Sequence, residues 1–347
     1  MRFPNILAVA ATAALSTLAS ARPLDAQRVS SVAELRSAID GARPGSTIRI
    51  APGTYDIGSR PLRIEGKRGL AIVGAGAKAT TIRSSPSAPY IFELAGSNDR
   101  LEIAGMTLLG ATRLTRNTHA LASGSDRMNL TRARFHDLEI RNAAVGISVV
   151  GSGNGYCDDV QITSNKLENI QDLVGSDGAT SGSGYGIHND GCSNVRIAGN
   201  TIRNADRHSI YQASAYQRGR PAASGSIVIE DNTIIDHGET SSLQSEWQVA
   251  LAIARSSNVT AARNEIINSY FDAISIEDPS EEQRGYAVRN VSLVDNVVRG
   301  SRAADVFITA AGTFTSRGNR FYRGSAAGPP VIRRDGKGKS GRLSSER

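Results

Sequence analysis

The segments Ile197-Ala-Gly-Asn-Thr-Ile202, Ile229-Glu-Asp-Asn-Thr-Ile234, Ala261-Ala-Arg-Asn-Glu-Ile266 and Leu293-Val-Asp-Asn-Val-Val298 repeat one pattern. Each carries an asparagine with an apolar residue two places after it. These asparagines recur every 32 residues. Weaker copies at 103–108 and 162–167 extend the series. They put Met106 and Asn165 in the asparagine column, with His136 filling the gap and Asn319 closing the series.

The alternation around each asparagine is that of a β-strand, and asparagine favours the turn beside it. A second strand follows in each repeat, with Ile147, Ile187, Ile210, Leu251, Ile274 and Val306 as its first inward residues. Such repeats, without intervening helices, predict an all-β, single-domain, right-handed parallel β-helix. Leucine is too sparse for a leucine-rich repeat. The asparagine column is interpreted as a hydrogen-bonded ladder rather than as a ligand site.

The two cysteines test this register. Cys157 and Cys192 each lie eight residues before an asparagine of the column. They therefore occupy equivalent positions in successive coils. Stacked strands are about 4.8 Å apart, a separation that a disulfide accepts. We expect a Cys157–Cys192 disulfide.

The two ends of the chain differ from the repeats. Residues 1–21 have a short apolar run before Ala19-Ser20-Ala21, which predicts a signal peptide, with cleavage after Ala26 as an alternative. Ser31 followed by Glu34 predicts a short capping helix at the open end of the stack. We expect the β-helix domain to span residues 22–326, and residues 327–347 to be a basic, disordered tail. The expected product is secreted or periplasmic, without a membrane span, and monomeric.

The formal net charge of +7 favours an acidic partner. No basic stripe interleaved with aromatic residues is present, which argues against nucleic acid. Between Lys166 and Lys337 every cation is an arginine, and its planar fork suits carboxylates and sulfates.

The stretches Tyr185-Gly-Ile-His-Asn-Asp190 and Arg207-His-Ser-Ile-Tyr-Gln212 concentrate the reactive side chains. If Ile187 and Ile210 face the core, His188 and Tyr211 face outward as neighbours in adjacent coils. Asp190 should lie on the same face beside Ala213, and Ala252 and Ser275 should continue the His188–Tyr211 column. The small residues indicate a shallow groove, bordered by the loops 171–183 and 236–247.

Other candidates are less firmly placed by the pattern. Alternation puts His208 out of phase at the entry to its strand, and Arg207, Tyr216, Arg218 and Arg220 flank the groove. Asp272, Glu277 and Asp278 offer paired carboxylates of the kind a glycosidase needs. A solvated turn before Pro279 is the favoured explanation for them, although Glu277 remains a substrate-binding candidate.

The segments Ala33-Glu-Leu-Arg-Ser-Ala-Ile-Asp40, Arg43-Pro-Gly-Ser-Thr-Ile48 and Ala51-Pro-Gly-Thr-Tyr55, with the Asn-centred coils, resemble the pectin-lyase-like superfamily of exported β-helices. The resemblance covers about residues 29–326. It implies the fold firmly and the reaction weakly, because such proteins include lyases, hydrolases, epimerases and glycan-binding proteins.

Arg207-His-Ser-Ile-Tyr211 resembles acidic-polysaccharide lyases of the alginate type, which implies β-elimination at a uronate. Tyr211 is then acid and possible base, and His188 or His208 is base or neutraliser. The substrate-binding candidates are Arg207, Asn189, Asp190, Arg218, Tyr216 and Glu277. The substrate would be alginate, pectate, glucuronan or a glycosaminoglycan. Related lyases that use lysine or calcium differ from this chain, which has no matching lysine or clear acidic column. Calcium is possible, but no metal ligand is predicted.

Overall fold

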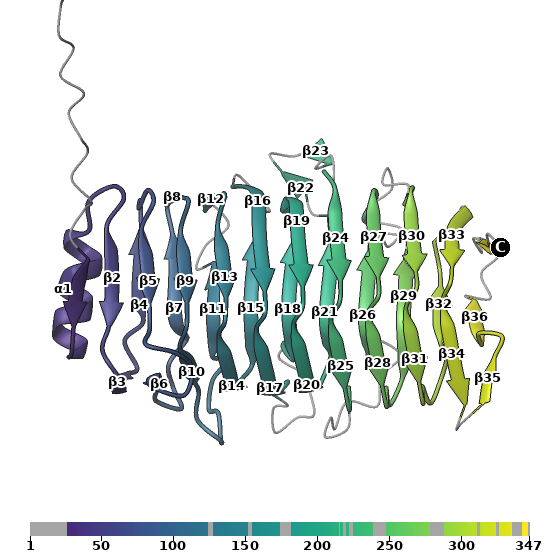
Figure 1. The fold of residues 1–347 in the computed structure, drawn as a ribbon, viewed down its shortest axis with the longest axis horizontal. Helices are drawn as coiled ribbons and strands as arrows, with labels where there is room; N and C mark the ends of the chain where they lie inside the picture. Colours follow the sequence, from purple (N-terminus) through teal and green to yellow (C-terminus); the bar gives the residue numbers. More distant parts are fainter. Residues whose placement is uncertain are drawn as a thin grey trace, which may run out of the picture.

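The computed structural model describes residues 26–123, 128–151, 155–173, 182–214, 216–217, 220–221, 225–238, 248–277, 288–310, 313–323, 326–334 and 342–345. Over these residues it is a stack of parallel coils, and the one helix they contain lies at the N-terminal end (Figure 1). The three long sheets are named A, B and C. In the described residues, no helix is long and apolar enough to cross a membrane.

Sheet A contains β1 (Gln27–Val29), β2 (Thr47–Ile50), β5 (Ala71–Val73), β8 (Ser97–Asp99), β9 (Glu102–Ala104), β12 (Asn129–Thr131), β13 (Arg134–His136), β16 (Tyr156–Thr163), β19 (Ser193–Ala198), β24 (Ile227–Glu230), β27 (Val259–Ala262), β30 (Val291–Val294), β33 (Thr313–Arg317) and β37 (Arg342–Ser345). Sheet B contains β3 (Gly53–Gly58), β6 (Thr80–Ser84), β10 (Thr107–Leu109), β14 (Glu139–Ala143), β17 (Lys166–Ile170), β20 (Thr201–Ala205), β25 (Thr233–Ile235), β28 (Glu265–Ile267), β31 (Val297–Arg299), β34 (Arg320–Arg323) and β35 (Ala326–Gly328).

Sheet C contains β4 (Leu62–Glu65), β7 (Tyr90–Ala95), β11 (His119–Ser123), β15 (Val145–Val150), β18 (Tyr185–Asp190), β21 (His208–Ala213), β26 (Val249–Ala254), β29 (Asp272–Glu277), β32 (Val306–Ile308) and β36 (Ile332–Arg334). A short antiparallel pair, β22 (Tyr216–Gln217) and β23 (Arg220–Pro221), lies outside the three sheets. Successive coils pair in parallel, and inward Ile, Leu and Val side chains form one continuous core.

Helix α1 (Val32–Gly41) covers the N-terminal end of the stack, as the sequence predicts (Figure 1). The Ser31 side chain caps it by accepting a hydrogen bond of 3.2 Å from the Glu34 backbone N–H. Leu35, Ala38 and Ile39 are buried against the first coil. The apolar face of the helix therefore closes the core where no further coil follows.

The asparagine ladder forms inside the stack. Asn232 Nδ2 donates to Asn264 Oδ1 at 2.9 Å, and Asn200 Nδ2 donates to Asn232 Oδ1 at the same distance. The chain of bonds runs from Asn165 to Asn319. The placement of His136 is wrong: His136 pairs with Thr163, and the Leu138 backbone N–H bonds to Asn165 Oδ1. Leu138, two residues later, therefore holds the column position.

A second asparagine column lies at the ends of the sheet B strands. Asn142, Asn169, Asn204 and Asn268 have φ between 54° and 56°. Asparagine tolerates this left-handed conformation better than most residues. Asn204 Nδ2 also donates to Asn169 Oδ1 at 3.1 Å. These residues turn the chain from sheet B towards sheet C at the same place in each coil.

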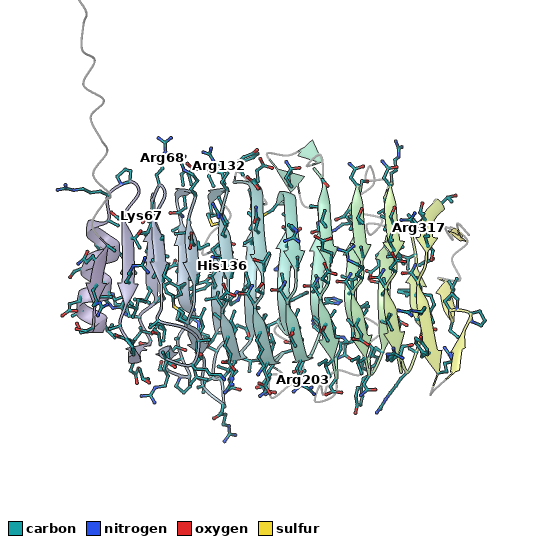
Figure 2. The ribbon with its side chains drawn as sticks, viewed as in Figure 1. Lys67, Arg68, Arg132, His136, Arg203 and Arg317 are labelled. Carbon is teal, nitrogen blue, oxygen red and sulfur yellow. A yellow bond between two sulfur atoms is a disulfide. The ribbon has the colours of Figure 1, made fainter. Side chains whose placement is uncertain are left out.

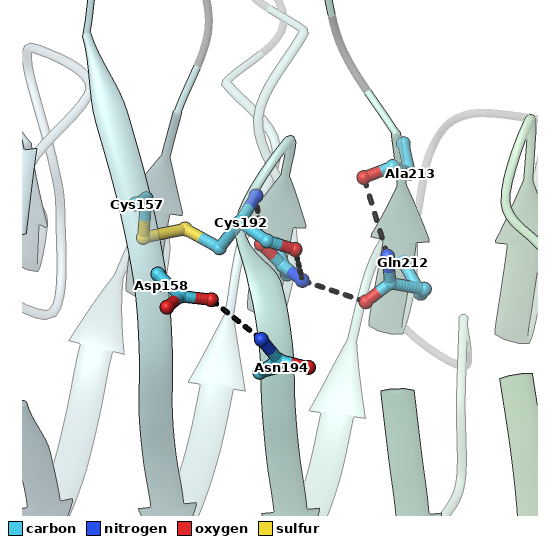
Figure 3. The surroundings of a disulfide bond; sticks show 7 residues. Cys157, Asp158, Cys192, Asn194, Gln212 and Ala213 are labelled. Carbon is cyan, nitrogen blue, oxygen red and sulfur yellow. Dashed lines mark hydrogen bonds between the residues drawn. A yellow bond between two sulfur atoms is a disulfide. The ribbon is translucent and has the colours of Figure 1, made fainter. Parts of the chain in front are cut away.

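The predicted disulfide is confirmed. Cys157 on β16 and Cys192 just before β19 are joined, with their Cα atoms 4.4 Å apart (Figure 3). The register Asp158–Ser193 puts the cysteines in equivalent positions of neighbouring coils. The bond therefore ties together two coils beside the strand that carries His188.

Part of the expected C-terminal tail pairs with the β-helix. β36 pairs in parallel with β32, and β37 pairs in parallel with β33. The chain therefore continues sheets A and C after residue 326, and these segments are not the disordered tail that their basic composition indicated. Residues 1–25, including the expected signal peptide, lie outside the described residues.

Candidate functional site

The sheet C strands bend, and this bend decides which side chains share the outer face. In β18, Ile187 is buried in the core. A Cβ on the preceding Gly186 would lie 3.0 Å from Cγ2 of Ile202, a core residue of sheet B. Residues 186 and 187 therefore both face inward. Residues on either side of this pair, Tyr185 and His188, are left on the outside.

The same geometry recurs one coil later. Ser209 and Ile210 of β21 are both fully buried, and His208 and Tyr211 flank them. The ring centroids of His208 and Tyr211 are 5.0 Å apart in a stacked arrangement. The out-of-phase position expected for His208 is therefore wrong, because strict two-residue alternation fails at the bend.

Four rings from two adjacent coils form one cluster, which we call the ring cluster: Tyr185, His188, His208 and Tyr211. Tyr185 lies 4.8 Å from His188, 5.3 Å from His208 and 5.5 Å from Tyr211, between ring centroids. His188 pairs directly with Tyr211 in the sheet, with centroids 5.4 Å apart. The predicted adjacency of His188 and Tyr211 is confirmed.

Tyr185 is the ring that sequence analysis did not select. It begins β18 and, by simple alternation from Ile187, would point into the core. The bend at Gly186 turns it outward instead. The glycine beside it was the signal in the sequence, because a glycine in a strand commonly marks a bend or a close approach.

Both histidines of the ring cluster are held neutral. Burial lowers the pKa of His208 to about 3, and the charge of His237 acts in the same direction. Burial also lowers the pKa of His188, although Asp190 opposes this effect. His208 Nδ1 lies 3.1 Å from the Val249 carbonyl oxygen. Because a carbonyl only accepts, Nδ1 carries the proton and Nε2 of the neutral ring carries the lone pair.

The lone pair of His208 faces the surface. Among the described residues, Nε2 of His208 has no hydrogen-bond partner, and it is not one of the fully buried atoms without a partner. It is therefore accessible although the residue as a whole is 6% exposed. His188 is held differently, with Nδ1 3.0 Å from Ser148 Oγ in the neighbouring coil.

Both tyrosines of the ring cluster keep their protons. Burial raises the pKa of Tyr211 well above its usual value of 10.0, with Arg255 opposing and Asp190 reinforcing the shift. Burial also raises the pKa of Tyr185, and Arg207 opposes it. The cluster therefore presents neutral imidazoles beside protonated phenols. This combination can supply a base and an acid to one bound substrate.

Two arginines border the ring cluster. Arg207 Nη2 lies 3.2 Å from Oδ2 of the buried Asp172, and its guanidinium carbon is 5.9 Å from the centre of the Tyr185 ring. Arg255, which follows β26, donates from Nη2 to Tyr211 Oη at 3.4 Å. The same Nη2 lies 3.8 Å from Asp190 Oδ1. The alternation of β26 could not select Arg255, because Arg255 follows the strand and reaches back to Tyr211 and Asp190 in the preceding coils.

The prediction that Asn189 binds substrate is wrong. Asn189, the second-last residue of β18, is fully buried. Its Nδ2 donates to Gln212 Oε1 at 2.7 Å, and its Oδ1 accepts from the Cys192 backbone N–H at 3.1 Å. Figure 3 shows Gln212 near the disulfide. Asn189 therefore fixes the coil from the inside.

The acidic candidates separate along β29. Asp272 is buried and its Oδ1 accepts from the Ala304 backbone N–H at 2.9 Å, so it is not part of a solvated turn. Glu277 shares a column with Asp190 and accepts from Ser275 Oγ. Asp272 and Glu277 lie five steps apart on an extended strand, so their Cα atoms are up to about 16 Å apart, whereas the carboxyl groups of a glycosidase pair are about 5–9.5 Å apart.

The remaining predicted contacts are only partly described. Tyr216 begins β22, at the loop that follows β21 (Figure 1). Arg218 and Asp278 lie outside the described residues, as do most of the loops expected to border the groove. In the described residues, no group of three or more His, Cys, Asp or Glu side chains could hold a metal ion.

The excess of arginine has a structural explanation on the outer faces of the coils. Arg196, Arg203 and Arg263 each pair with an acidic residue in a neighbouring coil. Figure 2 shows Arg203 at the lower edge of the stack. Much of the positive charge therefore ties coil to coil rather than marking a substrate groove.

Comparison with known proteins identifies the architecture. The chain is a right-handed parallel β-helix, and residues 180–337 match the family model described as "right handed beta helix region". A search of curated proteins found no match.

Solved structures extend the likeness over most of the chain. The alginate lyase from Paenibacillus sp. str. FPU-7 has a TM-score of 0.64 at 17% identity, covering 89% of this chain and 97% of that chain. Geobacillus virus E2 ORF18 has a TM-score of 0.51 at 14% identity, covering 90% of this chain and 58% of that chain. The Azotobacter vinelandii mannuronan C-5 epimerase AlgE4 A-module has a TM-score of 0.45 at 14% identity, with 90% coverage of both chains. At these identities the first two matches show the fold alone.

Proposed function

We propose that this protein is an exported polysaccharide lyase that cleaves a uronate-containing polysaccharide by β-elimination. The observation that carries the proposal is the ring cluster, where the accessible Nε2 of His208 and the protonated phenol of Tyr211 lie on stacked rings 5.0 Å apart. Elimination needs a base and an acid at adjacent positions of one sugar residue, and this pair supplies both.

In the proposed reaction, His208 Nε2 takes the proton from C5 of the uronate. The C4–O bond then breaks, its electron pair leaves with the glycosidic oxygen, and a C4–C5 double bond forms. Tyr211 gives its phenolic proton to the departing oxygen. The proton later returns from His208 to Tyr211 through solvent, so both groups regain their starting states.

The base would strengthen when substrate binds. His208 is neutral in the free protein, and an adjacent carboxylate raises the pKa of an imidazole by stabilising its protonated form. The structure favours Tyr211 as acid over Tyr211 as base, because burial opposes formation of a tyrosinate in the free protein. This narrows the double role that the sequence resemblance implies.

Arg255 and Arg207 are proposed to neutralise the uronate carboxylate. Charge neutralisation lets negative charge build up on the carboxylate when the C5 proton leaves. Arg255 already contacts the Tyr211 phenol, so it would also stabilise the tyrosinate formed after proton transfer. His208 would then abstract the proton and the arginines would neutralise the carboxylate, in place of the lysine that related lyases use.

Two further observations agree with the proposal. One solved structure that shares this fold along nearly its whole length is an alginate lyase. The disulfide fits an exported protein, because such bonds persist in oxidising compartments. The expected signal peptide at residues 1–21 completes this part of the proposal.

The test is a panel of alginate, pectate, glucuronan, hyaluronan and chondroitin incubated with purified protein. A lyase generates the ultraviolet absorbance of an unsaturated uronate. Tyr211→Phe should abolish this signal and retain binding, whereas Tyr322→Phe on sheet B should behave as wild type. New reducing ends without this absorbance would indicate a hydrolase. A change in uronate stereochemistry at constant chain length would indicate an epimerase. Binding that persists without any turnover would indicate a glycan-binding protein.

A further inference from the structure

A second pair of outward rings lies on sheet C, towards the N-terminal end from the ring cluster. Tyr90 of β7 pairs with His119 of β11, with ring centroids 5.3 Å apart and planes inclined by 55°. Both side chains are partly exposed. His119 shares a column with Tyr185 and His208, with Val145 in the coil between His119 and Tyr185. The two groups of rings therefore lie along one line on one sheet.

An arginine accompanies this pair. Arg116 is exposed, and its charge lowers the pKa of the Tyr90 phenol, which burial raises overall. Among the described residues, Arg116 makes no ion pair. Glu93, which also acts on Tyr90, is bonded to Arg63 Nη1 at 2.9 Å. A cation three residues before His119 in the chain, which makes no ion pair among the described residues, therefore acts on the Tyr90 phenol.

His119 contributes an apolar face rather than a charge. Burial lowers its pKa to about 4, and the charge of His188 acts in the same direction. Its buried Nδ1 has no hydrogen-bond partner in the described part of the chain. Sugar rings commonly bind against aromatic faces, whose apolar body and polar edges match theirs. A neutral ring beside Tyr90 and a free cation suit an acidic sugar.

We infer that Tyr90, His119 and Arg116 form a second binding subsite for a uronate residue of the same polysaccharide chain. The inference rests on the proposed function for the identity of the chain. His119 and Tyr185 are two coils apart, or about 10 Å. An extended pyranose chain advances by roughly one residue per coil, so the subsite holds a sugar about two residues from the one that reacts.

The subsite lies on the N-terminal side of the ring cluster. In the two coils that follow β21, the same two columns continue with the buried residues Val249 and Ala252 and then with Asp272 and Ser275. A ring, Phe307, returns only in the third coil. Substrate binding should therefore be stronger on the N-terminal side of the reacting sugar. Short oligosaccharides that fill only the ring cluster would not sense the subsite.

A surface hollow at the N-terminal end is a poorer candidate for binding a uronate. Arg36 and Arg63 line it with Glu93. Arg36 Nη1 donates to the Pro61 carbonyl oxygen at 2.6 Å, and Arg63 pairs with both Glu65 and Glu93. These arginines are already bonded within the protein, whereas Arg116 offers its charge to a ligand.

The test measures binding of uronate oligosaccharides of increasing length, from mannuronate, guluronate and galacturonate series, in a Tyr211→Phe background. Arg116→Ala and Tyr90→Leu should each weaken binding of long oligosaccharides by about tenfold and leave disaccharide binding unchanged. The matched controls are Arg299→Ala and Tyr322→Leu. Arg299 lies over the Tyr322 ring at 4.1 Å on sheet B, so it reproduces an arginine–tyrosine pair away from sheet C.

The outcomes separate this inference from the proposed reaction. If the Arg116 and Tyr90 variants bind oligosaccharides of every length as tightly as the Tyr211→Phe parent does, and the wild type cleaves the polymer, the subsite is overturned and the lyase proposal stands. Length-dependent loss in a protein that turns over no acidic polymer would support the subsite and overturn the reaction. Absence of binding to every oligosaccharide would overturn both. Circular dichroism of each variant establishes that the coils remain folded.

Discussion

Arg255 Nη2 donates a hydrogen bond of 3.4 Å to the phenolic oxygen of Tyr211, from one coil to the coil before it. Because the oxygen accepts from Arg255, its own O–H is left to donate elsewhere, which is what an acid catalyst requires. The positive charge would also stabilise the tyrosinate that remains after donation. One contact thus supports both the initial and the final state of proton transfer.

Replacing Arg255 should therefore reduce turnover more than it reduces stability. We expect Arg255→Ala to lower kcat by about 10² or more, in the range of removing one preorganised donor from a developing charge. Arg255→Lys should recover part of this loss, because it keeps the charge without the planar fork. Steady-state kinetics on the best polymer measure both effects. Arg263→Ala, which removes an exposed, ion-paired arginine, is the control.

The pH dependence of kcat/KM distinguishes the two roles available to Tyr211. His208 has a pKa of about 3 in the free protein and Tyr211 has a pKa above 10.0. If His208 is the base and Tyr211 the acid, both are in the required state at neutral pH. We expect kcat/KM to stay level between about pH 6.5 and 9. A rate that climbs tenfold per pH unit across this range would instead mark a tyrosinate base.

Buried His237 should make stability fall in mild acid. Burial lowers its pKa from 6.5 to about 3, and its Nδ1 lies 3.1 Å from Ser209 Oγ. Since the unfolded chain binds this proton more readily, the stabilisation is complete above pH 6.5 and is lost as the pH falls towards 3. The melting temperature should begin to fall before carboxylates protonate at about pH 4.

The variant His237→Gln isolates the effect of His237 protonation on stability. The comparison uses only the slope of unfolding free energy against pH, in the variant and in the wild type. We expect the slope of the unfolding free energy between pH 6 and 4.5 to decrease by about one proton, or about 1.4 kcal/mol per pH unit. Chemical denaturation at several pH values supplies the slope even if the variant is less stable throughout. An unchanged slope would show that His237 is not the titrating group.

The asparagine ladder should be costly to interrupt. Asn232 accepts from the Asn200 backbone and side chain, and it donates to Asn264 and to the Ile197 carbonyl. Asn232→Ala strands several buried polar groups, and we expect a loss of about 2–4 kcal/mol in unfolding free energy. Asn129→Ala breaks an exposed Asn–Ser bond of 2.9 Å and should cost less than about 1 kcal/mol. Similar losses in both variants would contradict an energetic role for burial.

The sequence was sufficient for the fold because its signals are repeated. The alternation around each asparagine recurs coil after coil, and one column of inward residues, from Ile147 to Val306, is aligned in the structure as predicted. The disulfide followed from the same register. His136 failed because the coil around it lacks the asparagine that fixes the alignment.

The site was less predictable because it depends on departures from the repeat. His188 and Tyr211 follow from alternation, whereas Tyr185 and His208 require the bend at Gly186 and Ser209. Arg255 requires knowledge of how far a side chain reaches past the end of its strand. Asn189 was misplaced although alternation puts it inward, because a polar residue beside His188 was taken for a ligand contact.

The bend in sheet C also makes the outer face modular. In the coils from β11 to β29, two positions three residues apart flank the inward pair that builds the core, and in some coils, such as that of Val249 and Ala252, both are buried. Exchanging the residues at these two positions leaves the inward pair unchanged. The pairs Tyr185–His188 and His208–Tyr211 fill these positions in adjacent coils, and Val249 and Ala252 fill them in the next. A scaffold of this kind can gain, lose or shift a binding position by one coil at a time while its core stays the same.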